Sequence, residues 1–166
     1  RDKVIRTLKK YKGKLIEVAF AKNISSAGIK NKIIKLGTIS NNRVSILKRL
    51  FYAKGIVRIL ESHNSLTGLI IENLKVVKKN SLNEFDGMWS SSLTDSATKG
   101  KPDNSSVDFS SRLTNLNEMM EVTSKLLVFD ADNGGQLEHL PFLIRSLERI
   151  GTSAIIIEDK VGLKKN

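Results

Sequence analysis

The sequence predicts an α/β fold built around a parallel sheet. Short apolar segments suited to buried strands occur at 56–60, 85–91, 126–131 and 153–157. Each is followed by a stretch compatible with a helix, and this alternation is typical of parallel strands joined by crossover helices. The clearest of the helices, Glu138–Ile150, has an apolar face and ends at Gly151.

The residues before this alternation predict a smaller βα unit. Residues 1–10 have helical spacing, and Lys12 and Gly13 end that helix. Leu15–Phe20 is short, apolar and rich in β formers, which predicts a buried strand. The hydroxyls of Ser25 and Ser26 can cap a helix that begins near Ala27 and closes the unit by about Leu36.

Turn-forming residues divide the chain further. Gly37–Asn42 has the composition of a linker, and Arg43–Ala53 returns to a helical pattern. Polar breakers follow at Asn80–Asn83 and at Thr98–Ser106, the second long enough for a mobile loop. We therefore expect three parts: a short α/β remnant at 1–36, a linker and leading helix at 37–55, and the main α/β region at 56–166.

Composition limits the function classes. The chain has no Cys, which excludes disulfides, thiolate metal sites and a cysteine nucleophile, and fits a reducing, cytoplasmic setting. It has no apolar leader and no apolar run near the roughly 18 residues that span a bilayer, so we expect a soluble protein without a membrane partner. The start at Arg1 and the lysine-rich end at Asn166 predict that both ends are cuts.

The net charge of +11 is unevenly distributed. Residues 1–80 hold 19 Lys and Arg against 4 Asp and Glu, whereas residues 81–166 hold 9 against 13. Aromatic residues are few in the basic half, so the stacking surface of a single-strand binder is missing and we expect no nucleic-acid partner. A basic nucleic-acid-binding module remains the alternative from another class, and it predicts polyanion binding that falls steeply with salt.

Acidic residues follow two of the predicted strands. Asp130 and Asp132 come after the apolar run Leu126–Phe129, and Glu158 and Asp159 come after Ala154–Ile157. Parallel strands end at one edge of a sheet, so these carboxylates would converge there. Hard oxygen ligands suit Mg²⁺, while the lack of Cys and the scarcity of His argue against zinc. For Asp130 and Asp132 alone, a preference of acids for strand ends explains the pattern about as well.

Two other segments lie at predicted strand ends. Gly134–Gly135 allows a tight turn that exposes backbone N–H groups, although paired glycines are usually only a turn. The single Trp, Trp89, adjoins three hydroxyls at Ser90, Ser91 and Ser92, which could offer donors to a carboxylate beside an apolar wall. A buried Trp next to a capping loop is the plainer interpretation.

Together these segments resemble successive motifs of the phosphoenolpyruvate mutase family, which belongs to the isocitrate lyase superfamily. The segments that carry the resemblance are, in order, Glu61–Asn64, Phe85–Ser96, Lys99–Asp103, Phe129–Gly135 and Ile157–Asn166. The resemblance implies a (β/α)8 barrel of the TIM type, of which 56–166 would form the first four βα units. A full barrel takes about 250 residues. Fewer than half of these follow position 55.

The resemblance also implies an activity and a set of roles. The activity is the Mg²⁺-dependent interconversion of phosphoenolpyruvate and phosphonopyruvate, which forms the carbon–phosphorus bond of phosphonate biosynthesis, in an enzyme that is a homo-oligomer when complete. Asp130 would hold Mg²⁺ directly, with Asp132 and Glu158 acting largely through its waters. The implied substrate and catalytic residues are Ser91, Ser92 and Leu93 around the pyruvate carboxylate and enol oxygen, Trp89 as a wall, Asp103 near the phosphoryl group, and Lys164 and Asn166 on a gating loop.

The chain also departs from the family. Ser62 stands where the family usually has Ala, and the Arg and His that the family supplies to the phosphoryl group from later strands lie beyond Asn166. We therefore expect the 166 residues alone to be inactive.

Asn166 favours a mutase over a phosphonopyruvate hydrolase, where Thr would be expected, and the absence of a Lys-Lys-Cys-Gly-His loop argues against the superfamily's carbon–carbon lyases. Lys14–Ile29 resembles the end of a cytidylyltransferase-type domain, but Ala27 replaces a Thr and the His-x-Gly-His motif is absent.

Overall fold

The computed structural model describes residues 2–14, 39–79 and 81–160 of a chain that divides into two compact units, Arg1–Lys32 and Ile33–Asn166. In the first unit, helix α1 spans Asp2–Lys10 and confirms the helix predicted at 1–10. An acidic residue in its first turn and two lysines in its last turn complement the helix dipole. The strand predicted at Leu15–Phe20 and the helix predicted from Ala27 lie outside the described residues.

The second unit contains the predicted parallel sheet, with strand order β1-β4-β5-β6. Its strands are β1 Ile59–Glu61, β4 Gly87–Ser90, β5 Leu126–Asp130 and β6 Ala154–Ile156. All three strand pairings are parallel, which confirms that the four apolar segments form one sheet in chain order. Every strand therefore ends at the same edge of the sheet.

Three helices pack in a row and form the core with the sheet. They are α5 Ser65–Asn73, α7 Phe109–Val122 and α8 Leu140–Ile150, with α7 contacting both of the others. Met88, Leu127 and Phe129 from the sheet pack with Leu116 and Met119 of α7, and all five are fully buried. Burial of these side chains supplies the main driving force for folding of this unit.

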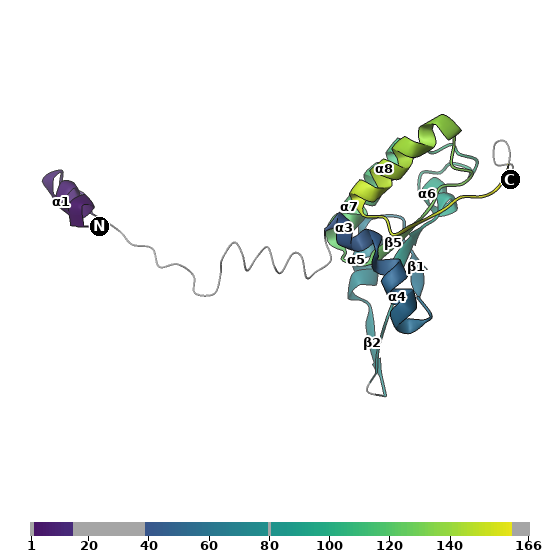
Figure 1. The fold of residues 1–166 in the computed structure, drawn as a ribbon, viewed down its shortest axis with the longest axis horizontal. Coiled ribbons are helices and arrows are strands. Elements are labelled where there is room, and N and C mark those ends of the chain that lie inside the picture. The colour runs from purple at the N-terminus through teal and green to yellow at the C-terminus, as the bar shows by residue number, and fades with distance from the viewer. Residues whose placement is uncertain (1, 15–38, 80, 161–166) are drawn as a thin grey trace. The chain divides into compact units, whose positions relative to one another are not determined.

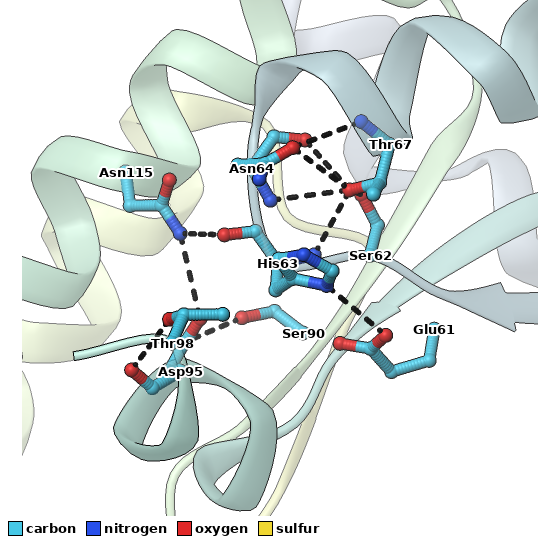
Figure 2. Close-up of polar contacts among 9 residues, drawn as sticks. All are labelled: Glu61, Ser62, His63, Asn64, Thr67, Ser90, Asp95, Thr98 and Asn115. Carbon is cyan, nitrogen blue, oxygen red and sulfur yellow. Dashed lines mark hydrogen bonds and ion pairs between the residues drawn. The ribbon is translucent and has the colours of Figure 1, made fainter. Parts of the chain in front are cut away.

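The helix ends follow local sequence signals. Asn64 caps α5 reciprocally: its Oδ1 accepts from Thr67 N at 2.9 Å, and its own N donates to Thr67 Oγ1 at 3.2 Å (Figure 2). The helix predicted at Glu138–Ile150 is confirmed, with its first turn as the 3-10 helix η1 Leu137–His139. It ends at Gly151, whose φ of 96° is in the left-handed region that glycine tolerates best.

The leading helix differs from the prediction. Helix α3 spans Ser40–Val44 and begins inside the predicted linker, and α4 spans Ile46–Lys54 after a break at Ser45. The early start of α3 is explained by contacts with residues distant in sequence. The Arg43 side chain is buried and donates from Nη1 to Met120 O at 2.9 Å and from Nη2 to Thr123 O. This anchoring holds α3 against the end of α7, and α4 then starts anew.

Positions 81–83, which were predicted to belong to a polar breaker, lie instead in a strand of a hairpin. Strands β2 Lys75–Lys78 and β3 Ser81–Glu84 pair antiparallel, and the hairpin projects away from the larger sheet in Figure 1. Lys79 at the turn has a φ of 48°. The prediction was wrong because the polar composition indicated a turn and did not reveal the strands on either side of it. These strands contain exposed β-branched residues such as Val77, which favour strand structure although no core packs against them. The loop predicted at Thr98–Ser106 is confirmed as lacking regular structure; it joins helix α6, Ser92–Ala97, to α7.

Candidate active site at the carboxyl edge of the sheet

The carboxyl ends of the four strands bring polar side chains to one edge. The register pairs Glu61 with Trp89, Ser90 with Phe129 and Asp130 with Ile156. The segments that follow each strand, including Ser91–Ser92 and Ile157–Glu158, continue from that edge. This edge is where α/β proteins with parallel sheets place their active sites.

Asp130 and Ser92 meet at this edge. The backbone N and the Oγ of Ser92 lie 3.3 and 3.1 Å from Asp130 Oδ2, and both can donate a hydrogen bond to it. Asp130 Oδ1 accepts from Asp132 N at 3.0 Å. The end of β5 thus contacts the start of α6, and the family resemblance implies different roles for these two segments.

Asp132 lies in the turn that follows β5. Its φ of 51° is left-handed, a conformation that Asp adopts more readily than most residues, and its side chain is buried. Its carbonyl oxygen accepts from Glu158 N at 2.6 Å, so the segments after β5 and β6 are tied together. Its Oδ2 lies 3.6 Å from Arg112 Nη1, while the Glu158 carboxylate forms an ion pair with Lys160.

The structure describes four of the six remaining predicted site residues. Ser91 is buried at the residue before α6, and Leu93, 60% exposed, faces outward from α6. Trp89 Nε1 is buried and has no hydrogen-bond partner within residues 2–14, 39–79 and 81–160. Asp103 is buried in the loop between α6 and α7. Lys164 and Asn166 lie outside the described residues.

A cavity of about 570 Å³ opens beside Asp132. It lies between the start of α7 and the turn after β5, and it is lined by Ser105, Val107, Asp108, Phe109, Asp132, Asn133, Gly135 and Gln136. The φ values of Gly134 and Gly135, 82° and 75°, give this turn its shape, as expected for the paired glycines. The cavity adjoins the Asp130–Ser92 contact without including either residue.

The donor groups at this edge suit a hard cation. Within the part of the chain that the structure describes, no three His, Asp or Glu side chains are grouped closely enough to hold a metal ion directly. A magnesium ion does not need such a group, because it usually takes one or two carboxylates and keeps several waters. Asp130 provides one part-buried carboxylate, and Asp132 and Glu158 are fixed to neighbouring positions by backbone contacts. The chemistry of the donor set therefore suits Mg²⁺ bound largely through water, but among the described residues the three carboxylates do not converge as the sequence predicted, because those of Asp132 and Glu158 pair with Arg112 and Lys160.

Sequence reasoning missed the polar side chains beneath the edge. Arg112 donates from Nε to Asp95 Oδ2 at 2.8 Å, and both side chains are almost fully buried. Asn115 donates from Nδ2 to His63 O at 2.7 Å, and His63 Nδ1 lies 3.4 Å from Glu61 Oε2 (Figure 2). One signal could have found Arg112: it occupies a position in the buried stripe of α7 that continues with Leu116, Met119 and Met120.

A parallel sheet with crossover helices and polar side chains at its carboxyl edge is typical of α/β enzymes, a class that includes the (β/α) barrels. Within this class the chain belongs to the phosphoenolpyruvate phosphomutase family, whose family model matches residues 47–166. A phosphoenolpyruvate phosphomutase of Tetrahymena pyriformis is 28% identical over 128 residues, which cover 76% of this chain and 40% of the relative. A phosphonopyruvate hydrolase of Variovorax sp. (strain Pal2) is 29% identical over 102 residues, covering 61% and 35%.

Solved structures show the same relationship. The phosphoenolpyruvate phosphomutase of Streptomyces platensis subsp. rosaceus superposes with a TM-score of 0.65 at 33% identity, over 74% of this chain and 40% of that one. A phosphonopyruvate hydrolase in complex with oxalate and Mg²⁺ shares the fold, with a TM-score of 0.62 at 24% identity over 72% and 39%. The chain thus spans about two fifths of the length of the relatives that it matches. None of the described helices is long and apolar enough to cross a membrane.

Proposed function

We propose that the protein takes part in the Mg²⁺-dependent interconversion of phosphoenolpyruvate and phosphonopyruvate. The observation that carries this proposal is the contact between Ser92 and Asp130, at 3.1 Å between Oγ and Oδ2. A residue proposed for the substrate carboxylate and a residue proposed for the metal come from neighbouring strands and meet at the edge where a substrate would enter.

The segment after β4 would bind the organic part of the substrate. Ser91 and Ser92 are buried hydroxyls at the start of α6, and Leu93 follows them. They would hold the carboxylate and the enol oxygen, and Trp89 would form the wall beside them. A pocket with one apolar wall and a few fixed polar donors is the usual design for a small anionic ligand.

The segments after β5 and β6 would hold the metal. Asp130 would bind Mg²⁺ directly, and Asp132 and Glu158 would act through its waters. When bound, the ion would neutralise negative charge on the phosphoryl and enolate oxygens. The hard oxygen donors support this proposal, and so does a structural relative, a phosphonopyruvate hydrolase whose crystal structure is a complex with oxalate and Mg²⁺.

The reaction is an isomerisation whose atoms balance without a further reactant. In the direction of phosphonopyruvate, the bond between phosphorus and the enol oxygen breaks and a bond between phosphorus and C3 forms. Phosphoryl transfer of this kind depends on positioning and charge neutralisation, and water must be kept out. Asp103 would lie near the phosphoryl group, and Lys164 and Asn166 would close over the substrate.

Hydrolysis of phosphonopyruvate is the second candidate. It is favoured by the Variovorax relative, which matches about as strongly in identity as the Tetrahymena mutase. The two reactions differ in whether water reaches the phosphoryl group. Asn166 favours the mutase, as the resemblance of its loop implies.

The products distinguish the two reactions. We would incubate the full-length gene product with Mg²⁺ and phosphonopyruvate and follow the mixture by phosphorus NMR. A mutase gives the resonance of phosphoenolpyruvate, whereas a hydrolase gives inorganic phosphate together with pyruvate. If neither forms, or if a chelator leaves the conversion unchanged, the proposed function is wrong.

Asp130→Ala tests the metal assignment in the same assay. We expect turnover to be abolished while cooperative unfolding remains, because the change removes a carboxylate at the sheet edge and little apolar packing. Glu118→Ala, which removes an exposed carboxylate from α7, is the matched control and keeps full turnover. Full activity in Asp130→Ala would reject the assigned role.

The remaining proposals concern the setting of this site. Residues 1–36 would derive from an upstream cytidylyltransferase-like domain, residues 37–55 would form a linker with its leading helix, and residues 56–166 would begin the mutase barrel. The complete enzyme would be a cytoplasmic homo-oligomer. Size-exclusion chromatography with light scattering would test the oligomeric state.

A further inference from the structure

Helix α7 carries two polar side chains on the face that it turns toward the sheet. Arg112 is 2% exposed and lies one turn before Leu116 in the buried stripe of the helix, and Asn115 lies one turn after Arg112. Leu or Met at position 112 would continue the stripe without the cost of burying a charge. Replacing buried ion pairs by apolar residues is often neutral or stabilising, so stability alone does not explain Arg112.

Arg112 lies between two buried carboxylates. Its Nε donates to Asp95 Oδ2 at 2.8 Å, and its Nη1 lies 3.6 Å from Asp132 Oδ2. The guanidinium also stacks over the Phe129 ring, 4.3 Å from the ring centre. A planar, forked cation can hold two carboxylates in a fixed relation, whereas a lysine ammonium is a point charge on a flexible stem.

The same cluster reaches the ends of two further strands. Asp95 Oδ2 accepts from Ser90 Oγ at 3.2 Å, and Asn115 Nδ2 lies 3.4 Å from Asp95 Oδ1. Asn115 also donates to the carbonyl oxygen of His63, so it joins the segment after β1 to α6 (Figure 2). Two side chains of α7 thus fix the segments that follow β1, β4 and β5.

We propose that Arg112 is a positioning residue, which holds Asp132 and, through Asp95, fixes the segment that carries Ser92 relative to the segment that carries Asp130. The Ser92–Asp130 contact is formed by one short side chain and one backbone N–H, and the buried cluster behind it sets the separation of the two segments. This inference rests on the proposed magnesium site but not on the reaction. Arg112 itself is almost fully buried, and in this proposal it acts through Asp132 and Asp95 rather than by contact with substrate.

The first test is Mg²⁺ binding by Arg112→Lys, measured by calorimetry on the full-length gene product without substrate. The ammonium can pair with Asp95 or with Asp132 but cannot hold both, so the carboxylate of Asp132 loses its fixed orientation. Residues that orient metal ligands typically change metal affinity by about 10- to 100-fold. We expect the dissociation constant for Mg²⁺ to rise by about that factor.

Asp95→Asn is the second variant. It tests the positioning role even if Arg112→Lys fails to fold and therefore shows no cooperative unfolding. It keeps the shape of the side chain and leaves Asp132 and Arg112 in place, but it removes the charge that orients the guanidinium. We expect a weaker affinity for Mg²⁺ in the same direction. Asp86→Asn is the matched control, because it breaks an ion pair between Lys54, which is partly exposed, and the shielded carboxylate of Asp86. Asp86 lies just before β4, at the end of that strand opposite to Ser90 and the candidate site.

The outcomes separate positioning from simple support of the fold. All three variants are expected to lower the free energy of unfolding, but only Arg112→Lys and Asp95→Asn should weaken Mg²⁺ binding. Equal Mg²⁺ affinities in all three variants and the wild type, or a wild-type protein that binds no Mg²⁺, would overturn the proposal. A wild-type protein that binds Mg²⁺ but converts no phosphonopyruvate would instead overturn only the proposed reaction.

Discussion

Gly87 lies so close to Leu126 on the neighbouring strand that no side chain fits at its position. A methyl group at Gly87 would lie 2.3 Å from Cγ of Leu126 and 2.9 Å from its carbonyl oxygen. The two residues are direct partners in the register of β4 and β5. The close approach therefore lies between the two central strands of the parallel sheet, at their amino-terminal ends and thus opposite to the candidate site.

Gly87→Ala should destabilise the protein. Overpacking a well-filled interior costs about 1–3 kcal/mol, and the carbonyl oxygen cannot move without disturbing the strand pairing. Chemical denaturation measures the loss in the free energy of unfolding. Gly68→Ala is the matched control, because a methyl group inside α5 would meet its nearest neighbours at 3.5–3.7 Å and glycine is unfavourable in a helix. The packing argument fails if both variants are equally stable.

Arg43→Met should destabilise the end of α7. The variant keeps an apolar stem of similar length but leaves the carbonyl groups of Met120 and Thr123 without their buried cationic donor. Hydrogen bonds from charged groups contribute about 1.5–3 kcal/mol each, so we expect a loss of at least about 1.5 kcal/mol in the free energy of unfolding. Arg49→Met, at an exposed position of α4, should change stability by less than about 0.5 kcal/mol.

Glu72 should make stability depend on pH in the acid range. Burial raises the pKa of its carboxyl. Hydrogen bonds from the Thr123 and Ser124 side chains and the Ser124 N–H, together with the charge of Lys125, lower that pKa by more, so the net pKa is below its ordinary value. The carboxylate therefore stabilises the folded state above the pKa of the unfolded chain, about 4.3. This contribution is lost as the pH falls through the lower pKa of the folded state.

Unfolding titrations of the wild type and Glu72→Gln between pH 7 and pH 3 check this sign. The stability difference between the two proteins should be constant near neutral pH and should shrink below about pH 4.3. Glu118→Gln controls for the change in net charge. A difference that grows on acidification would contradict the assignment.

Asp108→Ala should weaken α7 at its start. Asp108 caps the helix: Oδ1 accepts from Ser111 N at 2.9 Å and Oδ2 from Ser111 Oγ at 2.8 Å. Loss of such a cap costs about 1 kcal/mol. Asp108→Asn keeps an oxygen acceptor and should lose only a fraction of that amount. Hydrogen bonds from the Ser111 N–H and hydroxyl lower the pKa of Asp108, so the cap's contribution should also fall in strong acid.

The candidate site was predictable only in part. The acidic strand ends placed Asp130, Asp132 and Glu158 at one sheet edge from sequence alone, because strands that alternate with helices run parallel and end together. The contact of Ser92 with Asp130 was not predictable, since the two lie 38 positions apart and their distance depends on how α6 packs. Asp95, Arg112 and Asn115 were also missed, because each looks like an ordinary polar helix residue until its partners are placed around it.

The sequence by itself determined the four parallel strands, their order, the helix that ends at Gly151 and the resemblance of the strand-end motifs to one enzyme family. These features depend on periodicity, turn residues and short motifs, which are properties of neighbouring positions in the chain. Tertiary structure alone decided the break between α3 and α4, the hairpin of β2 and β3, and the burial of Arg43 and Arg112. Arg43 donates to a carbonyl group 77 positions away, and Arg112 to a carboxylate 17 positions away. Such partners are chosen by the packing of whole elements, because a buried charge is tolerated only where a distant group completes its hydrogen bonds.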